Sequence, residues 1–119
     1  MRVRITLLIA LFITTLLAGC GETGDREPEN LSERVDLLIE EDRYEEALDL
    51  LESEDKNNPE IQLLLEKTHL NYGLNNMSTF DAGQMRTRMN NALIQFAEVL
   101  KINPENEVAR NQINQILGV

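Results

Sequence analysis

The sequence predicts a protein built only from α-helices, and three observations favour this fold class. From Leu31 onward, apolar residues recur at intervals of three and four, the spacing that places them on one face of a helix. No stretch of useful length alternates between apolar and polar residues, as a half-buried strand does. Pro59 and the Asn103-Pro104 pair interrupt the pattern where one helix would end and another begin. With 119 residues, the chain is long enough for one domain and not for two.

Polar or helix-breaking residues divide this pattern into five expected helices. The first opens at Leu31 and stops before Glu41-Asp42-Arg43, and the second opens at Tyr44 and fades into the polar run before Pro59. The third begins at Pro59, because the first helical turn does not need the missing proline N–H. It is apolar nearly all round, which predicts the most buried element, and the stretch from Gly73 to Asn76 should end it. The last two helices are expected at 81–102 and 105–117.

The first twenty residues, MRVRITLLIALFITTLLAGC, have the layout of a secretory signal. Arg2 and Arg4 give the positive start, and an apolar run from Ile5 to Leu17 follows. At 1.5 Å per residue this run reaches about 20 Å, short of the ~30 Å hydrocarbon core, which indicates a signal segment rather than a spanning helix. The tetrapeptide Leu17-Ala18-Gly19-Cys20 holds the one cysteine of the chain and resembles the lipobox of bacterial lipoproteins.

The lipobox resemblance implies a covalent lipid anchor. It places cleavage between Gly19 and Cys20, a diacylglyceryl group on the Cys20 thiol and an acyl group on the new amino terminus. Two or three acyl chains would make membrane attachment effectively permanent. In Gram-negative lipoproteins an Asp after the cysteine is the common inner-membrane retention signal. Gly21 stands there instead, so the resemblance favours the outer membrane with the domain facing the periplasm. An uncleaved membrane anchor is the alternative, weakened by the short apolar run.

The expected organisation is a cleaved signal at 1–19, a lipidated tether at 20–30 and a helical domain at 31–119. The tether is polar and contains Gly and Pro, and about ten such residues reach only about 17 Å, so the domain should lie close to the membrane. The whole chain carries a net charge of −10, and −12 remains once the signal with its two arginines is removed. A surface this acidic repels phosphate backbones and anionic headgroups, so nucleic acid is not an expected partner.

Two segments of the domain repeat one pattern. Ala47 and Ala92 are each followed by a large apolar residue four positions later and by a proline twelve positions later. The small residue lets paired helices approach, the large one fills the space beside it, and the proline opens the next unit. This pattern resembles the second helix of the tetratricopeptide repeat, and Tyr72 lies thirteen residues after Pro59, where the first helix of that family places a Tyr.

The resemblance implies two tetratricopeptide-like hairpins and a C-terminal helix that acts as the polar cap of the array. The match is incomplete, since Leu31 or Leu65 takes the early Trp position of the family and Glu54 stands where another Ala is usual. Tyr72 to Ala92 spans twenty residues, about eleven more than the repeat has. An insertion around Met77 to Met89 should therefore lengthen the second hairpin. A plain irregular helical bundle is the alternative fold.

Residues able to do chemistry are scarce. His69, the one histidine, lies on the apolar third helix and is expected to be packed there; without a second His or a free Cys, neither a zinc site nor a nucleophile is expected. The acidic run at 40–46 lacks the order of a calcium-binding loop, and no Gly-rich phosphate loop is present. Met77, Met85 and Met89 are interpreted as core filler rather than an adaptable binding surface. We expect no enzyme, no metal and no cofactor besides the lipid on Cys20.

A binding role is the remaining class. Hairpin repeats form a concave surface from their first helices, and a basic or amphipathic peptide would suit an acidic one. Under the family geometry that groove would include Ser32, Asp36, Ile39, Leu63, Glu66 and Leu70. We therefore expect a membrane-anchored, non-catalytic interaction module whose partner is a protein or peptide of the cell envelope. The alternative is a structural or self-associating accessory subunit of an envelope complex, and the oligomeric state stays open.

Overall fold

The structure is a computed structural model that describes residues 30–78 and 81–119. These residues form five α-helices and no strand, so the predicted all-α class is confirmed. The predicted signal and nearly all of the tether, including Gly19 and Cys20, lie outside the described residues. No helix in the described part of the chain is both long enough and apolar enough to cross a membrane. The helices are α2 (Leu31–Glu40), α3 (Tyr44–Glu52), α4 (Pro59–Ser78), α5 (Met85–Ile102) and α6 (Glu107–Leu117).

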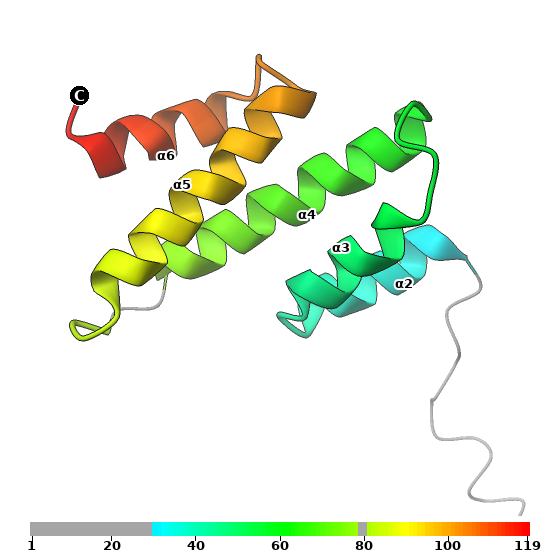
Figure 1. Cartoon of the computed structure of the whole chain (residues 1–119), viewed down its shortest axis with the longest axis horizontal. Helices are drawn as coiled ribbons and strands as arrows, with labels where there is room; N and C mark the ends of the chain where they lie inside the picture. The colour runs from blue at the N-terminus through cyan, green and yellow to red at the C-terminus, as the bar shows by residue number, and fades with distance from the viewer. Residues whose placement is uncertain (1–29, 79–80) are drawn as a thin grey trace, which may run out of the picture.

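The helices are arranged around α4 (Figure 1). The short α2–α3 hairpin packs on α4 through both of its helices, and α5 runs back along α4 to form a longer second hairpin. The last helix, α6, reverses direction again and packs on α5. The second hairpin consists of helices of 20 and 18 residues, compared with 10 and 9 residues in the first hairpin.

Two clusters of buried side chains hold these layers together. The first joins α2, α3 and the start of α4, and the second joins α5 and α6 to the later part of α4. Because α4 contributes to both, it is the central element, as its apolar sequence predicted. It is not buried all round, since Leu63 on its outer face is 66% exposed. The first cluster contains Val35, Ala47, Leu51, Ile61 and Leu64, and the second contains Ala92, Phe96, Val99 and Ala109.

The turn between α2 and α3 is closed by backbone geometry rather than by glycine. Asp42 adopts the left-handed conformation with φ 60°, and the N–H of Arg43 donates to the carbonyl of Leu38 at 2.8 Å. This arrangement satisfies the last carbonyls of α2 and reverses the chain in three residues. A non-glycine residue tolerates this φ most readily when it is Asn or Asp. The sequence predicted that the helix breaks at residues 41–43, but not the backbone conformation of the turn.

The predicted end of the third helix at Gly73 is wrong, because α4 continues to Ser78. Gly73 is buried in mid-helix, and a Cβ built on it would lie 2.6 Å from the ring of Phe96. The glycine therefore serves close helix packing rather than helix termination. Asn76 does not break the helix either, since its side chain donates to the carbonyl of Tyr72 at 2.9 Å.

The last two helices begin later than predicted. Residues 81–84 form a turn in which the carboxylate of Asp81 accepts from the N–H of Gly83 at 3.0 Å, so α5 starts at Met85 and not at residue 81. The final helix starts at Glu107 rather than residue 105, because the Asn106 side chain caps it by accepting from the N–H of Ala109 at 3.0 Å. A turn therefore precedes α5 and a side-chain cap begins α6, and apolar periodicity alone reports neither.

Side chains from the repeated pattern lie in the two clusters. Ala47 and Leu51 are fully buried in the first, and Ala92 and Phe96 are fully buried in the second. Pro59 is the first residue of α4, as predicted. The second proline differs, because Pro104 lies in the loop before α6. Each alanine thus occupies a site where a larger side chain would push two helices apart.

Candidate functional site

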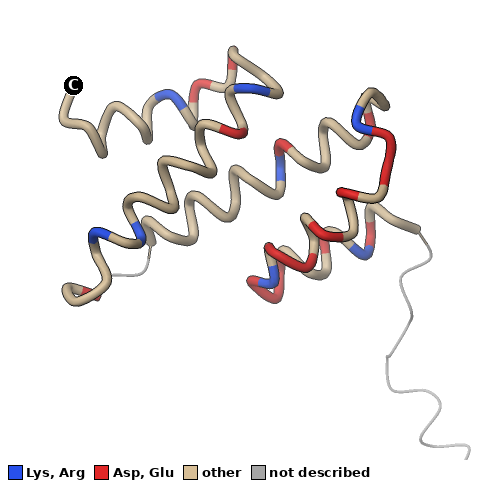
Figure 2. The backbone as a smooth tube through the Cα atoms, viewed as in Figure 1, with Lys and Arg blue, Asp and Glu red and all other residues tan. Residues whose placement is uncertain are grey.

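Acidic residues are gathered at one end of the molecule (Figure 2). Residues 30–60, which include α2, α3 and the connection to α4, contain twelve acidic and three basic residues. The described residues from 61 onward contain five of each. The net charge of this domain is therefore carried almost entirely by the α2–α3 hairpin. A cationic partner would be drawn to this end of the molecule.

A hollow of about 320 Å³ opens within this acidic region. The α2–α3 turn and the start of α3 form one side of it, and Tyr72 of α4 contributes from the other. The rings of Tyr44 and Tyr72 stack with their centroids 5.0 Å apart and 10° between their planes. We call this hollow the tyrosine cleft. Its lining residues are Asp42, Arg43, Tyr44, Glu45, Glu46 and Tyr72.

Both tyrosine hydroxyls donate to carboxylates. Tyr44 Oη donates to Asp42 Oδ1 at 2.9 Å, and Tyr72 Oη donates to Glu45 Oε1 at 3.0 Å. The side-chain amide of Asn75 on α4 also donates to Asp42 Oδ1, at 3.0 Å. Burial, reinforced by the Asp42 carboxylate, raises the pKa of Tyr44 to about 12, and burial also raises the pKa of Tyr72. The two phenols are therefore neutral hydrogen-bond donors at neutral pH, and they fix the carboxylates that line the cleft.

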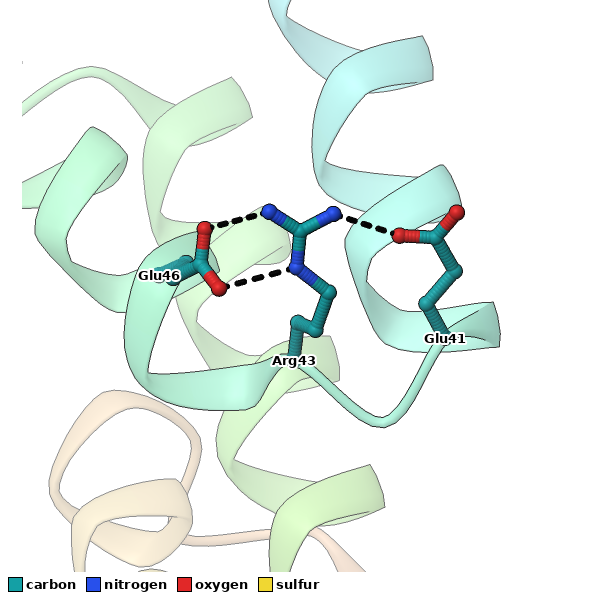
Figure 3. A network of polar contacts seen from close by, with 3 residues as sticks. All are labelled: Glu41, Arg43 and Glu46. Atoms are coloured by element: carbon teal, nitrogen blue, oxygen red, sulfur yellow. Dashed lines mark hydrogen bonds and ion pairs between the residues drawn. The ribbon is translucent and has the colours of Figure 1, made fainter.

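Arg43 is the one cation in the cleft lining, and two glutamates hold it (Figure 3). Its Nε and Nη2 donate to the two carboxylate oxygens of Glu46 at 2.8 and 2.6 Å. Its Nη1 donates to Glu41 at 2.7 Å. These bonds raise the pKa of Arg43 and lower the pKa of Glu46. Because all three side chains are exposed, the network contributes little to stability, and it keeps Arg43 turned toward its own glutamates.

The cleft therefore combines an aromatic floor with an excess of negative charge. Asp42 and Glu45 carry charge that Arg43 does not neutralise through any ion pair in the described structure. A Lys or Arg side chain would pair with such carboxylates, and the partly exposed Tyr72 ring lies beside them. The cleft lining includes neither a His nor a Cys side chain. No three His, Cys, Asp or Glu side chains within 30–78 and 81–119 converge as metal ligands would.

The six residues predicted for the binding groove lie on α2 and α4, and none of them lines the tyrosine cleft. Asp36 accepts from Lys67 Nζ at 2.6 Å, which links α2 to α4. Glu66 accepts from the side-chain amides of Asn103 and Asn106, at 2.9 Å each, which ties α4 to the α5–α6 loop. These two acids thus have partners within the fold.

The other four predicted residues have varied surroundings. Ile39 packs against the first buried cluster and Leu70 against the second. Ser32 is partly buried and Leu63 is exposed on α4. A groove made from these residues stays a prediction.

The residues that sequence reasoning missed are Asp42, Glu45 and the pairing of the two tyrosines. Tyr44 was used as a helix start and Tyr72 as a repeat marker, although they are the two tyrosines of the chain. Their contact spans 28 positions and depends on how α3 packs on α4. The available signal was that Tyr44 stands between acidic pairs, with Glu41-Asp42 before it and Glu45-Glu46 after it.

His69 and the methionines also have definite places. His69 is partly buried, and its Nδ1 lies 2.7 Å from Gln95 Oε1, which makes Nδ1 the donor in a bond between α4 and α5. Met77 packs against the second cluster, as core filler should. Met85 and Met89 do not, because they line a hollow of about 520 Å³ between α5 and α6. Met85 is 42% exposed, so its interpretation as core filler is wrong, whereas Met89 is partly buried.

No protein-family model matches the chain, and no curated protein or solved structure matches it significantly.

Proposed function

We propose that the protein is a membrane-anchored lipoprotein whose helical domain acts as a non-catalytic protein–protein interaction module of the bacterial cell envelope. The domain captures a basic or amphipathic segment of another envelope protein through its acidic α2–α3 end. The tyrosine cleft is the observation that carries this proposal. The carboxylates of Asp42 and Glu45 lie beside two stacked rings in an open hollow, which supports capture of a Lys or Arg side chain.

We further propose that the fold is a short tetratricopeptide-like array of two hairpins and a terminal helix. Two observations support it. Ala47 with Leu51, and Ala92 with Phe96, occupy buried sites at matching points of the two hairpins. Each of α2 and α3 also packs on α4, as successive helices do when repeats stack. The unequal hairpin lengths are the main departure from a regular array.

The lipobox at 17–20 supports the anchored location. Attachment at Cys20 leaves ten tether residues before α2, so the acidic hairpin is the part of the domain nearest the membrane. Intact-mass measurement of the protein extracted from cell membranes tests this step. We expect a chain that begins at Cys20 and carries two or three acyl chains, and the Cys20→Ser variant should leave the membrane fraction. An unmodified cysteine in the extracted chain would rule the anchor out.

Co-purification from detergent-solubilised envelopes tests the binding role. The natural protein should enrich a partner that the Glu45→Gln and Tyr72→Ala variants retain poorly. Glu45→Gln keeps an oxygen that can accept from Tyr72 and removes only the charge. Glu105→Gln is the matched control, because it removes one exposed carboxylate in the α5–α6 loop, outside the tyrosine cleft. Equal enrichment by all variants, or no enriched protein, contradicts the proposal.

A further inference from the structure

A second docking surface lies at the opposite end of the molecule from the acidic hairpin. The helices α5 and α6 diverge from their connecting loop, and the space between them is a groove of about 520 Å³ (Figure 1). Met85, Met89 and Leu93 form an i, i+4, i+8 stripe along α5, and Ile116 and Leu117 of α6 face it. Met85 is 42% exposed and Leu117 is 59% exposed, so this apolar surface is open to solvent.

The shape and composition of the groove fit a helix. A stripe at intervals of four on one wall and apolar residues on the other are what an amphipathic helix requires when it lays its apolar face into a groove. The groove is thus an open apolar surface with a wall on each side.

The charges around the groove indicate an acidic occupant. Arg86 lines it and takes part in no ion pair with a described residue, and no Asp or Glu is among the lining residues. A carboxylate on the incoming helix would pair with a guanidinium at this rim. The occupant proposed for the tyrosine cleft is basic, so the two surfaces would bind partners of opposite charge.

A second copy of the chain does not supply such a helix. Outside the groove, the exposed large apolar side chains of the described helices stand singly, with Leu37 on α2, Leu63 on α4, Ile94 on the outer side of α5 and Val108 on α6. None of these belongs to a stripe of three exposed apolar residues that could fill the groove. We therefore propose that the α5–α6 groove docks an amphipathic helix of another protein, with an apolar stripe at i, i+4 spacing and a carboxylate that pairs with Arg86.

This surface goes beyond the proposed function, because it gives the protein a second partner of opposite charge. A molecule that holds a basic segment at one end and an acidic helix at the other bridges two proteins. The test must therefore report on the groove separately from the tyrosine cleft.

Site-specific photo-crosslinking in the producing cells tests the proposal on the full chain. A benzophenone amino acid replaces Met85 in one version and Leu37, which is 44% exposed, in the control version. We expect an adduct with another protein from position 85, mapped by mass spectrometry to a helical segment with apolar residues at i, i+4 spacing and a nearby Asp or Glu. An adduct of two copies, an adduct with lipid, a mapped segment without a carboxylate, or no adduct overturns the proposal.

Two substitutions made beside the crosslinker at position 85 sharpen the result. Leu117→Glu and Arg86→Glu should each lower the adduct yield by about fivefold or more, because one places a charge in the apolar wall and the other repels the carboxylate. Leu63→Glu is the matched control on an exposed leucine outside the groove and should leave the yield unchanged. All three variants should still co-purify with the basic partner, which shows that the domain is folded and separates this proposal from the first. Equal yields in the three variants overturn the groove assignment.

Discussion

Several residues of this domain occupy positions that their intrinsic conformational preferences would not favour, and close contacts explain why they are there. Gly73 occupies the middle of α4, where alanine would be the better helix former by about 1 kcal/mol. Asp42 holds a left-handed backbone and accepts two hydrogen bonds at once. Tyr44 is 7% exposed and directs its hydroxyl at a carboxylate. Each residue is explained by a neighbour from another helix or by the turn that it closes.

Gly73→Ala should destabilise the domain although it raises helix propensity. The new Cβ would meet three ring atoms of Phe96 at 2.6–2.9 Å, and Phe96 is fully buried and cannot swing away. We expect a loss of about 1–3 kcal/mol in the free energy of unfolding, measured by urea denaturation. Gly83→Ala is the control, because its Cβ would meet only the Asp81 carboxylate at 3.5 Å. Phe96→Leu should make Gly73→Ala less costly, and strict additivity of the two changes would contradict the assigned contact.

The tyrosine pair predicts a loss of stability at alkaline pH. The folded pKa of Tyr44 is about 12 and the unfolded value is near 10, so its contribution is fully present below pH 10 and is lost as the pH rises toward 12. That contribution amounts to as much as about 2–3 kcal/mol. Tyrosinate absorbance measures it directly, since the chain has two tyrosines and no tryptophan. Both tyrosines should ionise at higher pH in the folded protein than in the urea-unfolded protein, and Tyr44→Phe should remove the ionisation step at the highest pH. Ionisation of both tyrosines near pH 10 in the folded protein would refute their burial.

At the scale of the elements, the helices are placed by capping and by contacts between helices that lie far apart in the sequence. Asn30 caps α2 and Asn106 caps α6, each by accepting from a backbone N–H three residues on. The Asn106 amide also donates to Glu66 on α4. Asn30 therefore only caps its helix, whereas Asn106 caps its helix and also links it to α4.

The two caps predict different costs for the same substitution. Asn30→Ala should lose about 1 kcal/mol, the value of a cap alone. Asn106→Ala should lose about 2–3 kcal/mol, because it also takes a donor from the Glu66 carboxylate. Thermal unfolding of both variants, followed by circular dichroism, gives the comparison. In a Glu66→Gln background the excess cost of Asn106→Ala should shrink, and equal costs for the two caps would mean that the link to α4 contributes nothing.

Sequence reasoning located the elements better than it located their ends or the site. Apolar periodicity identified all five helices because each buries one face. It failed at Gly73, because the sequence alone does not distinguish a glycine that ends a helix from one that makes room for an aromatic ring of a neighbouring helix. It also missed the tyrosine cleft, because the stacking of Tyr44 on Tyr72 depends on how α3 crosses α4. The predicted acidic character was right, and its concentration on α2 and α3 could be counted from the sequence alone.

The whole molecule has two ends with different chemistry. The α2–α3 hairpin carries nearly all of the net charge and leads into the tether, whereas the α5–α6 end has an open apolar groove with an unpaired arginine. The central helix α4 contributes to both buried clusters and so joins the two ends. This arrangement suits the proposed role, in which partners are held on both sides of a domain that is anchored to a membrane through Cys20.

The central claim is that the acidic end recognises a cation through the tyrosine cleft. A binding titration of the full protein in detergent with a fluorescent peptide of alternating lysine and serine tests it most directly. We predict saturable one-to-one binding that weakens as salt is raised, becomes about three- to tenfold weaker in Glu45→Gln, and is unchanged in Glu105→Gln. Salt-insensitive binding, or equal affinities for the two glutamine variants, would contradict the claim.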